Sequence, residues 1–217
     1  MDIGYLWHSV PLLLRGLVVT LEATGLGMAI ASILGLVIAV VRLLRVPVLA
    51  RMMDVYILFV RSTPLLVQLF FLFYVLPWYG ITLSAFAVGM WGLGMHFAAY
   101  TAEVYRAGFE QVPKGQWEAA RALNLGPGHT LALVIFPQAL RPIVPALGNY
   151  LISMFKDSSL LATITVYELL GVTRQLAAES FQYTTLFTAM GAIYFLLAYP
   201  SSLAVRYAER RLRQGQN

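Results

Sequence analysis

Apolar runs long enough to cross a lipid bilayer occupy most of this chain. A helix of about 20 residues spans the hydrocarbon core, and five such runs can be identified, at 17–41, 55–78, 83–104, 134–155 and 184–205. Charged residues make up only 12% of the 217 residues, about half the share found in soluble proteins. We therefore predict a single all-α membrane domain over 1–217 with about five transmembrane helices. The residues before 17 are expected to lie along the outer surface as an amphipathic segment.

The basic residues are distributed unevenly between the two predicted sides of the membrane. One side carries most of them, at the ends of apolar runs: Arg42, Arg45, Arg51, Arg106, Lys114, Arg121, Arg206, Arg210, Arg211 and Arg213. Arg141 is a candidate for the same side, whereas the opposite side carries only Arg15, Lys156 and Arg174. Because Lys and Arg concentrate in cytoplasmic loops, we expect the N-terminus outside and the C-terminus in the cytoplasm. An odd number of spans agrees with this orientation.

Residues that carry enzymatic or metal chemistry are missing or scattered. The chain has no cysteine, and its three histidines, His8, His96 and His129, stand at no metal-ligand spacing. No Ser/His or paired-carboxylate constellation is evident, so we predict no catalytic residue and no metal site. The net charge of +5 is dispersed along the chain, which argues against a nucleic-acid partner and for a topology signal in the lipid bilayer.

Small residues recur at every fourth position of the first run. They are Gly27, Ala31, Gly35 and Ala39. A stripe of small side chains lets a second helix approach closely within a membrane. We expect this stripe to be a packing surface.

The polar segment between the third and fourth runs has the composition of a helix. Residues 115–124 contain strong helix formers, with Glu118 and Arg121 three positions apart. Pro113 precedes this stretch, and Gly126-Pro127-Gly128 ends it. The sequence thus predicts a short charged helix on the cytoplasmic face, and an ordinary interfacial helix is the plain alternative.

The spacing within this segment resembles the EAA loop of bacterial ABC importer permeases. The pattern of that family is Glu-Ala-Ala, three residues, Gly, nine residues, and Ile-x-Leu-Pro. Here Glu118-Ala119-Ala120 is followed at the same spacings by Asn124 and by Val134-Ile135-Phe136-Pro137. Asn124 replaces the glycine, while Val134 and Phe136 replace other apolar residues. Since Asn tolerates a left-handed backbone better than most residues, the turn that ends the helix can be retained.

Two further segments narrow the resemblance to polar amino-acid permeases of the histidine, glutamine and arginine type. They are Val60-Arg61-Ser62-Thr63-Pro64-Leu65-Leu66-Val67-Gln68-Leu69-Phe70-Phe71 and Phe155-Lys156-Asp157-Ser158-Ser159-Leu160. The resemblance implies a non-enzymatic, multi-pass subunit of the bacterial inner membrane that moves a polar amino acid or related zwitterion inward by alternating access. The implied partners are two ATP-binding cassette ATPase subunits, a second permease chain, identical or related, and an extracytoplasmic solute-binding protein.

The resemblance also assigns roles to the short helix. In such permeases this helix docks into a groove of the ATPase and carries its motion to the membrane. The residues implied in that contact are Glu118, Ala119, Ala120, Arg121, Asn124 and Gly126. This chain has no Gly-x-x-x-x-Gly-Lys-Ser/Thr phosphate loop, so it is expected to bind no cofactor, with ATP and Mg in the partner ATPase.

Polar side chains inside apolar runs are costly, so each requires a role. The candidates for a substrate pathway are Arg61, Ser62, Thr63, Glu103, Lys156, Asp157 and Ser158. A structural alternative to the pathway role remains open for each group. Arg61 and Glu103 would form an ion pair that fastens two spans together, and Lys156, Asp157, Ser158 and Ser159 would cap the fourth run at the outer interface. We expect His96 to be a packed, hydrogen-bonded residue.

A secondary carrier is the main alternative from another class of transporter. It would need coupling-ion sites or a proton relay within the membrane. The intramembrane charges are few and no inverted repeat is evident, which favours the ABC permease.

Overall fold

The computed structural model describes residues 3–214, and the side chains of residues 4–212. These residues form helices joined by short loops, with no β-strand in the described part of the chain. The longer helices are α1 (Ile3–Leu43), α2 (Pro47–Ser62), α4 (Ala85–Glu110), α7 (Phe136–Asp157), α8 (Leu169–Ser180) and α9 (Tyr183–Gln214). The shorter ones are α3 (Leu65–Phe70), η1 (Phe71–Val75), η2 (Leu76–Tyr79), α5 (Lys114–Ala122), α6 (Pro127–His129), η3 (Thr130–Ile135) and η4 (Ser158–Ile164). The predicted all-helical class is confirmed.

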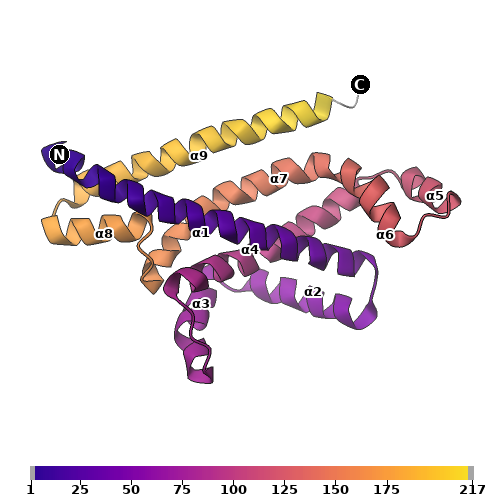
Figure 1. The fold of residues 1–217 in the computed structure, drawn as a ribbon, viewed down its shortest axis with the longest axis horizontal. Coiled ribbons are helices and arrows are strands. Elements are labelled where there is room, and N and C mark those ends of the chain that lie inside the picture. Colours follow the sequence, from indigo (N-terminus) through magenta and orange to yellow (C-terminus); the bar gives the residue numbers. More distant parts are fainter. Residues whose placement is uncertain (1–2, 215–217) are drawn as a thin grey trace.

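Three helical stretches are long and apolar enough to cross a membrane. They are Gly4–Leu43, Pro127–Ile164 and Tyr183–Leu212, and a fourth is possible if Pro47–Ser62 and Leu65–Tyr79 form one broken span. α4 contains most of the predicted third run, 83–104, but is not among these stretches. α4 nevertheless lies alongside α1 in the interior of the bundle (Figure 1). A fifth span through α4 therefore stays a prediction.

The predicted run at 55–78 is not one continuous helix. α2 ends at Ser62 and α3 begins at Leu65, and the two parts are bent by 106°. Pro64 lacks an N–H group, and its ring disfavours a helical backbone at the residue before it. Thr63 is accordingly extended, with φ −117° and ψ 140°. The expected single helix is therefore two helices that meet at the proline.

The residues before 17 are the first turns of α1, and their position at the outer surface stays a prediction. α1 runs without interruption from Ile3 to Leu43, a length of roughly 60 Å. Leu13, near its beginning, is fully buried in a cluster with residues of α8 and α9, among them Leu169 and Leu186. This packing stabilises the N-terminal turns as a continuation of the helix.

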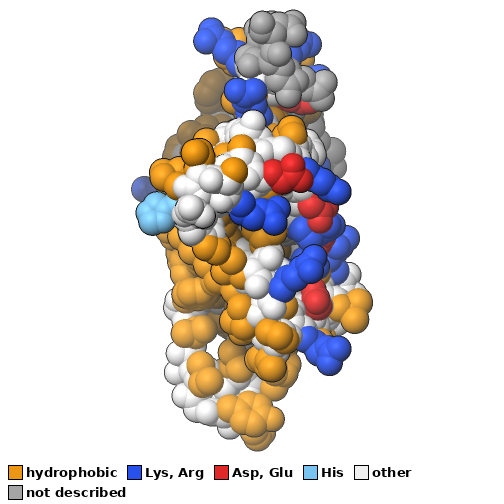
Figure 2. All heavy atoms as spheres, turned by 90° about the vertical axis from the view of Figure 1, so that its right-hand side faces the viewer, with side chains coloured by type: hydrophobic (Ala, Val, Ile, Leu, Met, Phe, Trp, Pro, Cys, Tyr) orange, Lys and Arg blue, Asp and Glu red, His pale blue; other side chains and the backbone are white. Residues whose placement is uncertain are grey.

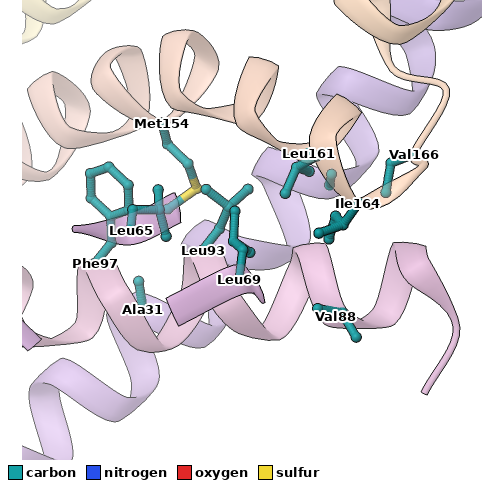
Figure 3. Packing of buried hydrophobic residues seen from close by; sticks show 11 residues of the cluster. Ala31, Leu65, Leu69, Val88, Leu93, Phe97, Met154, Leu161, Ile164 and Val166 are labelled. Atoms are coloured by element: carbon teal, nitrogen blue, oxygen red, sulfur yellow. The ribbon is translucent and has the colours of Figure 1, made fainter. Parts of the chain in front are cut away.

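α4 is the central helix of the core. The largest buried cluster contains side chains from α1, α3, α4 and α7 and from the segment that follows α7 (Figure 3): Ala23, Ala31, Leu65, Leu69, Val88, Leu93, Phe97, Met154, Leu161, Ile164 and Val166. η1 and η2, in which no residue is buried, project from this core beyond α3 (Figure 1). Because α3 packs on α4 through Leu65 and Leu69, the bend is fixed by the core as well as by Pro64.

The predicted small-residue stripe on α1 lies against α4. A Cβ atom at Gly35 would lie 2.1 Å from Oγ1 of Thr101, and one at Gly27 would lie 3.2 Å from Cβ of Leu93. Thr101 donates a hydrogen bond of 2.7 Å to the carbonyl oxygen of Ala31. The stripe thus allows two helix backbones to approach within side chain-to-backbone hydrogen-bonding distance, which confirms its role in packing.

Candidate functional site

The predicted cytoplasmic helix is present as α5, at the end of the molecule where α4 ends and α7 begins (Figure 1). It covers Lys114–Ala122, whereas 115–124 was expected. The helix begins directly after Pro113, which cannot donate the backbone hydrogen bond that a helix interior requires. At the other end, Leu123 and Asn124 form a turn.

This turn has the geometry of a Schellman motif. Asn124 has a left-handed backbone, with φ +53°. The N–H of Leu125 donates to the carbonyl of Ala120 at 3.1 Å, and the N–H of Asn124 donates to that of Arg121 at 2.9 Å. These are the two bonds that satisfy the last carbonyls of a helix when glycine occupies the left-handed position. The prediction that Asn124 can replace the family's glycine is confirmed.

α5 has one face toward the protein and one toward solvent. Ala120 is only 2% exposed, and Trp117 packs against a cluster that includes Phe109 of α4 and Ile135 of η3. Glu118 and Ala119 are exposed. The inward face of α5 is therefore occupied within this chain, and the outward face is free to contact a partner.

The other residues implied in the contact with the ATPase, Arg121, Asn124 and Gly126, are exposed as well. Arg121 donates through Nε to the carbonyl of Trp117 at 3.3 Å, and no ion pair joins it to Glu118 among the described side chains. Leu123, which the sequence analysis did not identify, is 74% exposed beside them, and Gly126 is exposed with open space around it. Charged side chains of both signs gather on this end of the molecule next to exposed hydrophobic ones (Figure 2).

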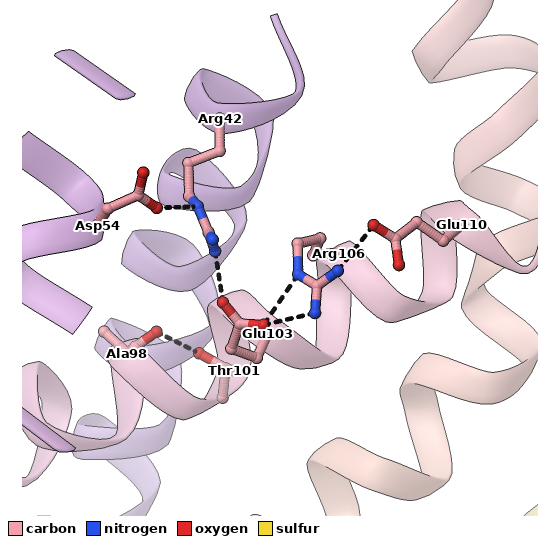
Figure 4. A network of polar contacts seen from close by, with 7 residues as sticks. All are labelled: Arg42, Asp54, Ala98, Thr101, Glu103, Arg106 and Glu110. Atoms are coloured by element: carbon pink, nitrogen blue, oxygen red, sulfur yellow. Dashed lines mark hydrogen bonds and ion pairs between the residues drawn. The ribbon is translucent and has the colours of Figure 1, made fainter. Parts of the chain in front are cut away.

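Glu103 belongs to a network of five charged residues. It pairs with Arg42 of α1 and, at 2.8 Å, with Arg106 of α4 (Figure 4). Arg42 also pairs with Asp54 of α2 at 2.8 Å, and Arg106 pairs with Glu110 at 2.7 Å. The network thus links three helices at the end of the bundle that carries α5.

The proposed Arg61–Glu103 ion pair is wrong. No ion pair joins these residues among the described side chains, because Glu103 is occupied by Arg42 and Arg106. The guanidinium of Arg61 instead lies over the ring of Tyr100, 5.3 Å from its centroid. Such a cation–π contact orients the guanidinium without neutralising its charge.

Gln68 bridges the break between α2 and α3, a role that the sequence analysis did not assign. Its side-chain nitrogen donates to the carbonyls of Val60 at 3.0 Å and Thr63 at 3.2 Å, and to Oγ1 of Thr63 at 2.7 Å. Its side-chain oxygen lies 3.0 Å from Nδ1 of His96. The amide therefore satisfies carbonyls released by the proline break, and His96 is packed and hydrogen-bonded as expected. The available signal was a lone amide side chain four residues after Pro64.

The polar residues at the end of α7 form no network with Arg61 and Glu103 in the described part of the chain. Ser158 is fully buried, donates to the carbonyl of Phe155 at 2.8 Å and also contacts the hydroxyl of Tyr194 on α9. Lys156 is exposed and Asp157 is half-buried. Among the described side chains, no hydrogen bond or ion pair connects 156–158 with either of the other candidate groups.

Glu168 is a buried acidic residue that the sequence analysis missed. It is 0% exposed and caps α8 by accepting from the N–H groups of Leu170 at 3.0 Å and Gly171 at 2.8 Å. Hydroxyl groups of Thr20 and Tyr194 lie within 3.4 Å and 3.0 Å of the same carboxyl. Burial raises the pKa of Glu168, although these four donors favour the charged form. Its position between two apolar runs, directly before Leu169-Leu170, was the only signal in the sequence.

The described residues contain no group of three or more His, Asp or Glu side chains that could hold a metal ion. The polar features are a surface helix, a charged network, a capped helix break and a buried carboxyl.

Comparison with known families identifies the chain. The family model described as "Binding-protein-dependent transport system inner membrane component" matches residues 8–214. A probable amino-acid ABC transporter permease of Sinorhizobium fredii is 44% identical over 211 residues, covering 97% of this chain and 91% of that protein. The L-cystine transport system permease of Bacillus subtilis is 36% identical, covering 93% and 87%.

Solved structures of ABC transporters have the same fold as this chain. A chain from the crystal structure of an amino acid ABC transporter with histidines superposes with a TM-score of 0.90 and 34% identity, covering 97% of this chain and 99% of that one. A chain of the inward-facing MetNI methionine ABC transporter gives 0.79 at 22% identity, which shows a shared fold. The chain therefore belongs to the inner-membrane permease components of binding-protein-dependent ABC importers, as the EAA spacing predicts.

Proposed function

We propose that this permease moves a polar amino acid or related zwitterion into the cytoplasm by alternating access, in a pair of permease chains. Two ATPase subunits, which bind ATP and Mg, drive the change of access through α5, and an external solute-binding protein delivers the substrate. The names of the amino-acid and L-cystine permeases among its relatives support the substrate class. The observation that carries the coupling role is the two-sided packing of α5.

The inward face of α5 explains how motion reaches the membrane helices. Trp117 and the buried Ala120 hold α5 against side chains of α4 and η3, and η3 leads directly into α7. A force applied to the outward face at Glu118 and Ala119 is therefore transmitted to two long helices as one packed unit. Packed interfaces of this kind shift between discrete arrangements more readily than they deform.

We place the substrate path beside the break between α2 and α3. A hollow of about 320 Å³ adjoins it, lined mainly by apolar side chains, among them Phe59, Phe71 and Met95, with Tyr56, Thr63 and Gln68 as its polar members. Irregular backbone is tolerated at membrane depth where it lines a cavity. Arg61, held over Tyr100 and without a carboxylate partner among the described side chains, is available for a substrate carboxylate, with the exposed Ser62 beside it.

The other polar candidates belong to the two ends of the path. Lys156 and Asp157 are proposed at the outer entrance, where Ser158 holds the backbone in position. Glu103, bound by two arginines, is proposed to hold the cytoplasmic end together. In this arrangement α4 is the fifth span, the N-terminus is outside and the C-terminus is inside.

ATPase activity of the assembled complex in proteoliposomes tests the proposal. We expect a ligand-loaded binding protein to stimulate ATP hydrolysis. Glu118→Lys or Ala119→Arg should reduce that stimulation by roughly 5- to 150-fold, the factor that typical coupling free energies between two sites produce. Arg141→Glu, a charge reversal at an exposed residue of α7 outside the coupling helix, is the control and should leave stimulation intact.

Ala120→Arg is unsuitable as a probe of coupling because it places a charge in the packing beneath α5. If the Glu118 and Ala119 variants are stimulated as strongly as the unmodified complex, coupling through α5 is wrong. Transport by the permease alone along an ion gradient would instead establish a secondary carrier.

A further inference from the structure

A hollow of about 520 Å³ lies at the α5 end of the bundle, separate from the break between α2 and α3. Its walls come from the end of α1, the turn that follows, the start of α2, the end of α4, and α5. Phe109 and Trp117 contribute apolar surface to it, whereas charged side chains contribute the rest. It is therefore amphipathic, and no step of the proposed transport cycle uses it.

The charges around the hollow do not balance. Four cations line it, Arg42, Arg45, Arg106 and Lys114, against two carboxylates, Asp54 and Glu110. Even with Glu103, which contacts both Arg42 and Arg106, the sum is positive. An excess of fixed positive charge in a partly enclosed site attracts an anion.

Two of the cations are without a counter-ion. Arg42 and Arg106 are fixed by carboxylates, whereas Arg45 and Lys114 form no ion pair with any side chain of residues 4–212. Lys114 is also the first residue of α5, and the first turn contains no acidic residue. A cation beside the positive end of a helix dipole is unfavourable, so an anion between Lys114 and Arg45 would relieve both charges.

We propose that this hollow binds the phosphate-bearing headgroup of an anionic phospholipid from the cytoplasmic leaflet. Exposed apolar side chains on the adjacent part of α2, Val48 and Met52, offer a surface for its acyl chains. Basic pockets between transmembrane helices on the cytoplasmic side suit such headgroups. The inference rests on the proposed orientation, which puts this end of the bundle in the cytoplasm.

The bound headgroup would connect two elements that the ion-pair network leaves separate. Arg45 lies in the α1–α2 turn and Lys114 lies on the coupling helix. A phosphate held by both would tie the position of α5 to the membrane surface. The negative charge of the inner leaflet would then set how firmly α5 is held before it contacts its partner.

The test uses the assembled transporter in nanodiscs that contain a photoreactive phosphatidylglycerol among zwitterionic lipids. We expect labelling of peptides within 42–54 and 109–117. The combined variant Arg45→Gly with Lys114→Ala should weaken retention of the anionic lipid by roughly 30-fold, as expected when two cations near the surface are lost. Glycine is chosen because Arg45 has a left-handed backbone, with φ +54°, so the turn is preserved while the charge is removed.

Two control variants show whether the lipid is retained by the charges of Arg45 and Lys114 in particular. One keeps both charges, and the other removes a cation elsewhere on the protein. Arg45→Lys with Lys114→Arg keeps both charges and should keep retention within a few-fold, although the left-handed turn is still strained. Arg141→Ala removes an exposed cation that does not line the hollow and should retain the lipid fully. Equal retention in the Gly/Ala variant and in Arg141→Ala would overturn the proposal.

Other outcomes overturn it in distinguishable ways. Labelling that free phosphate abolishes would indicate a site for a soluble anion, and labelling that occurs only without the ATPase subunits would mean that a protein partner covers the hollow. Equal labelling by a zwitterionic probe would indicate unspecific lipid contact. Stimulation of ATPase activity by the binding protein, measured in zwitterionic nanodiscs, reports separately on the proposed transport function.

Discussion

The hydroxyl of Tyr194 donates a hydrogen bond to the carboxyl of Glu168 across 3.0 Å, which fastens α9 to the beginning of α8. The same carboxyl receives a hydrogen bond from Thr20 of α1. Three helices, α1, α8 and α9, thus share one acceptor with no exposure to solvent. A buried acceptor of this kind stabilises only as long as all its donors remain paired.

Removing this acceptor should destabilise the permease strongly. Glu168→Ala leaves the N–H groups of Leu170 and Gly171 and the hydroxyl of Tyr194 without this acceptor. Each buried donor left unpaired should lower the free energy of unfolding by about 1–3 kcal/mol. Tyr194→Phe should cost about 1–2 kcal/mol. Thermal unfolding of the purified complex in detergent measures both. Equal melting temperatures for Glu168→Ala and the unmodified protein would contradict the network.

The raised pKa of Glu168 predicts a pH dependence of stability. Because the folded state holds the proton more tightly than the unfolded chain, where a Glu pKa is about 4.3, this stabilisation is present at acidic pH. It is lost as the pH rises through the folded-state pKa. Glu168→Gln, which resembles the protonated carboxyl, should flatten this part of the profile of melting temperature against pH. An unchanged slope in that variant would assign the dependence to other groups.

Gly35→Ala should disrupt the contact between α1 and α4. The added Cβ would lie 2.1 Å from Oγ1 of Thr101 and 2.9 Å from the backbone nitrogen of Ala102, so a helix has to shift. Overpacking of this kind costs about 1–3 kcal/mol. Gly25→Ala on the same helix meets nothing within 4 Å and is the matched control. Similar yields and melting temperatures for the two variants would argue against the close approach.

Gln68→Leu should weaken the break between α2 and α3. The carbonyls of Val60 and Thr63 lose their hydrogen-bond donor in an environment poor in water. Each loss should lower the free energy of unfolding by about 1–3 kcal/mol. A double-mutant cycle with His96→Ala isolates the Gln68–His96 contact, and we expect a coupling of about 0.5–3 kcal/mol. Additive losses in melting free energy would show that the two side chains act independently.

Replacing Asn124 by glycine should preserve the turn after α5, whereas replacing it by a β-branched residue should disturb that turn. Its left-handed backbone costs a residue other than Gly, Asn or Asp about 1–2 kcal/mol, so Asn124→Val should loosen the end of α5 and lower binding-protein-stimulated ATPase activity. Asn124→Gly should leave the activity close to that of the unmodified complex. If the Val and Gly variants behave alike, the turn after α5 does not need this conformation.

Most local features of the coupling helix α5 could be predicted from the sequence, but its packing could not. Its position, its length to within two residues and the left-handed turn at Asn124 follow from local punctuation and spacing. The burial of Ala120 does not, because it depends on where η3 runs after the turn. A local pattern identifies a helix, but only its neighbours decide which face is covered.

The intramembrane charges show the opposite case. The sequence identified Arg61 and Glu103 as residues that require partners, and the partner suggested for each was wrong. Arg42 lies 61 positions before Glu103, and nothing in their spacing indicates that α1 and α4 bring them together. The capping role of Gln68 at the break after α2 became apparent only when α3 was placed against α4.

Hydropathy, composition and motif spacing are local properties of the chain, and they were enough to predict the membrane class, the helical content and the EAA segment. The partners of Glu103, the cation–π contact of Arg61 and the burial of Glu168 depend on residues far away in the sequence; the contact of Glu168 with Thr20 spans 148 positions. Apolar helices can pack in many rotations and registers with similar burial of surface. The contacts of individual polar side chains are therefore fixed only when the helix faces meet.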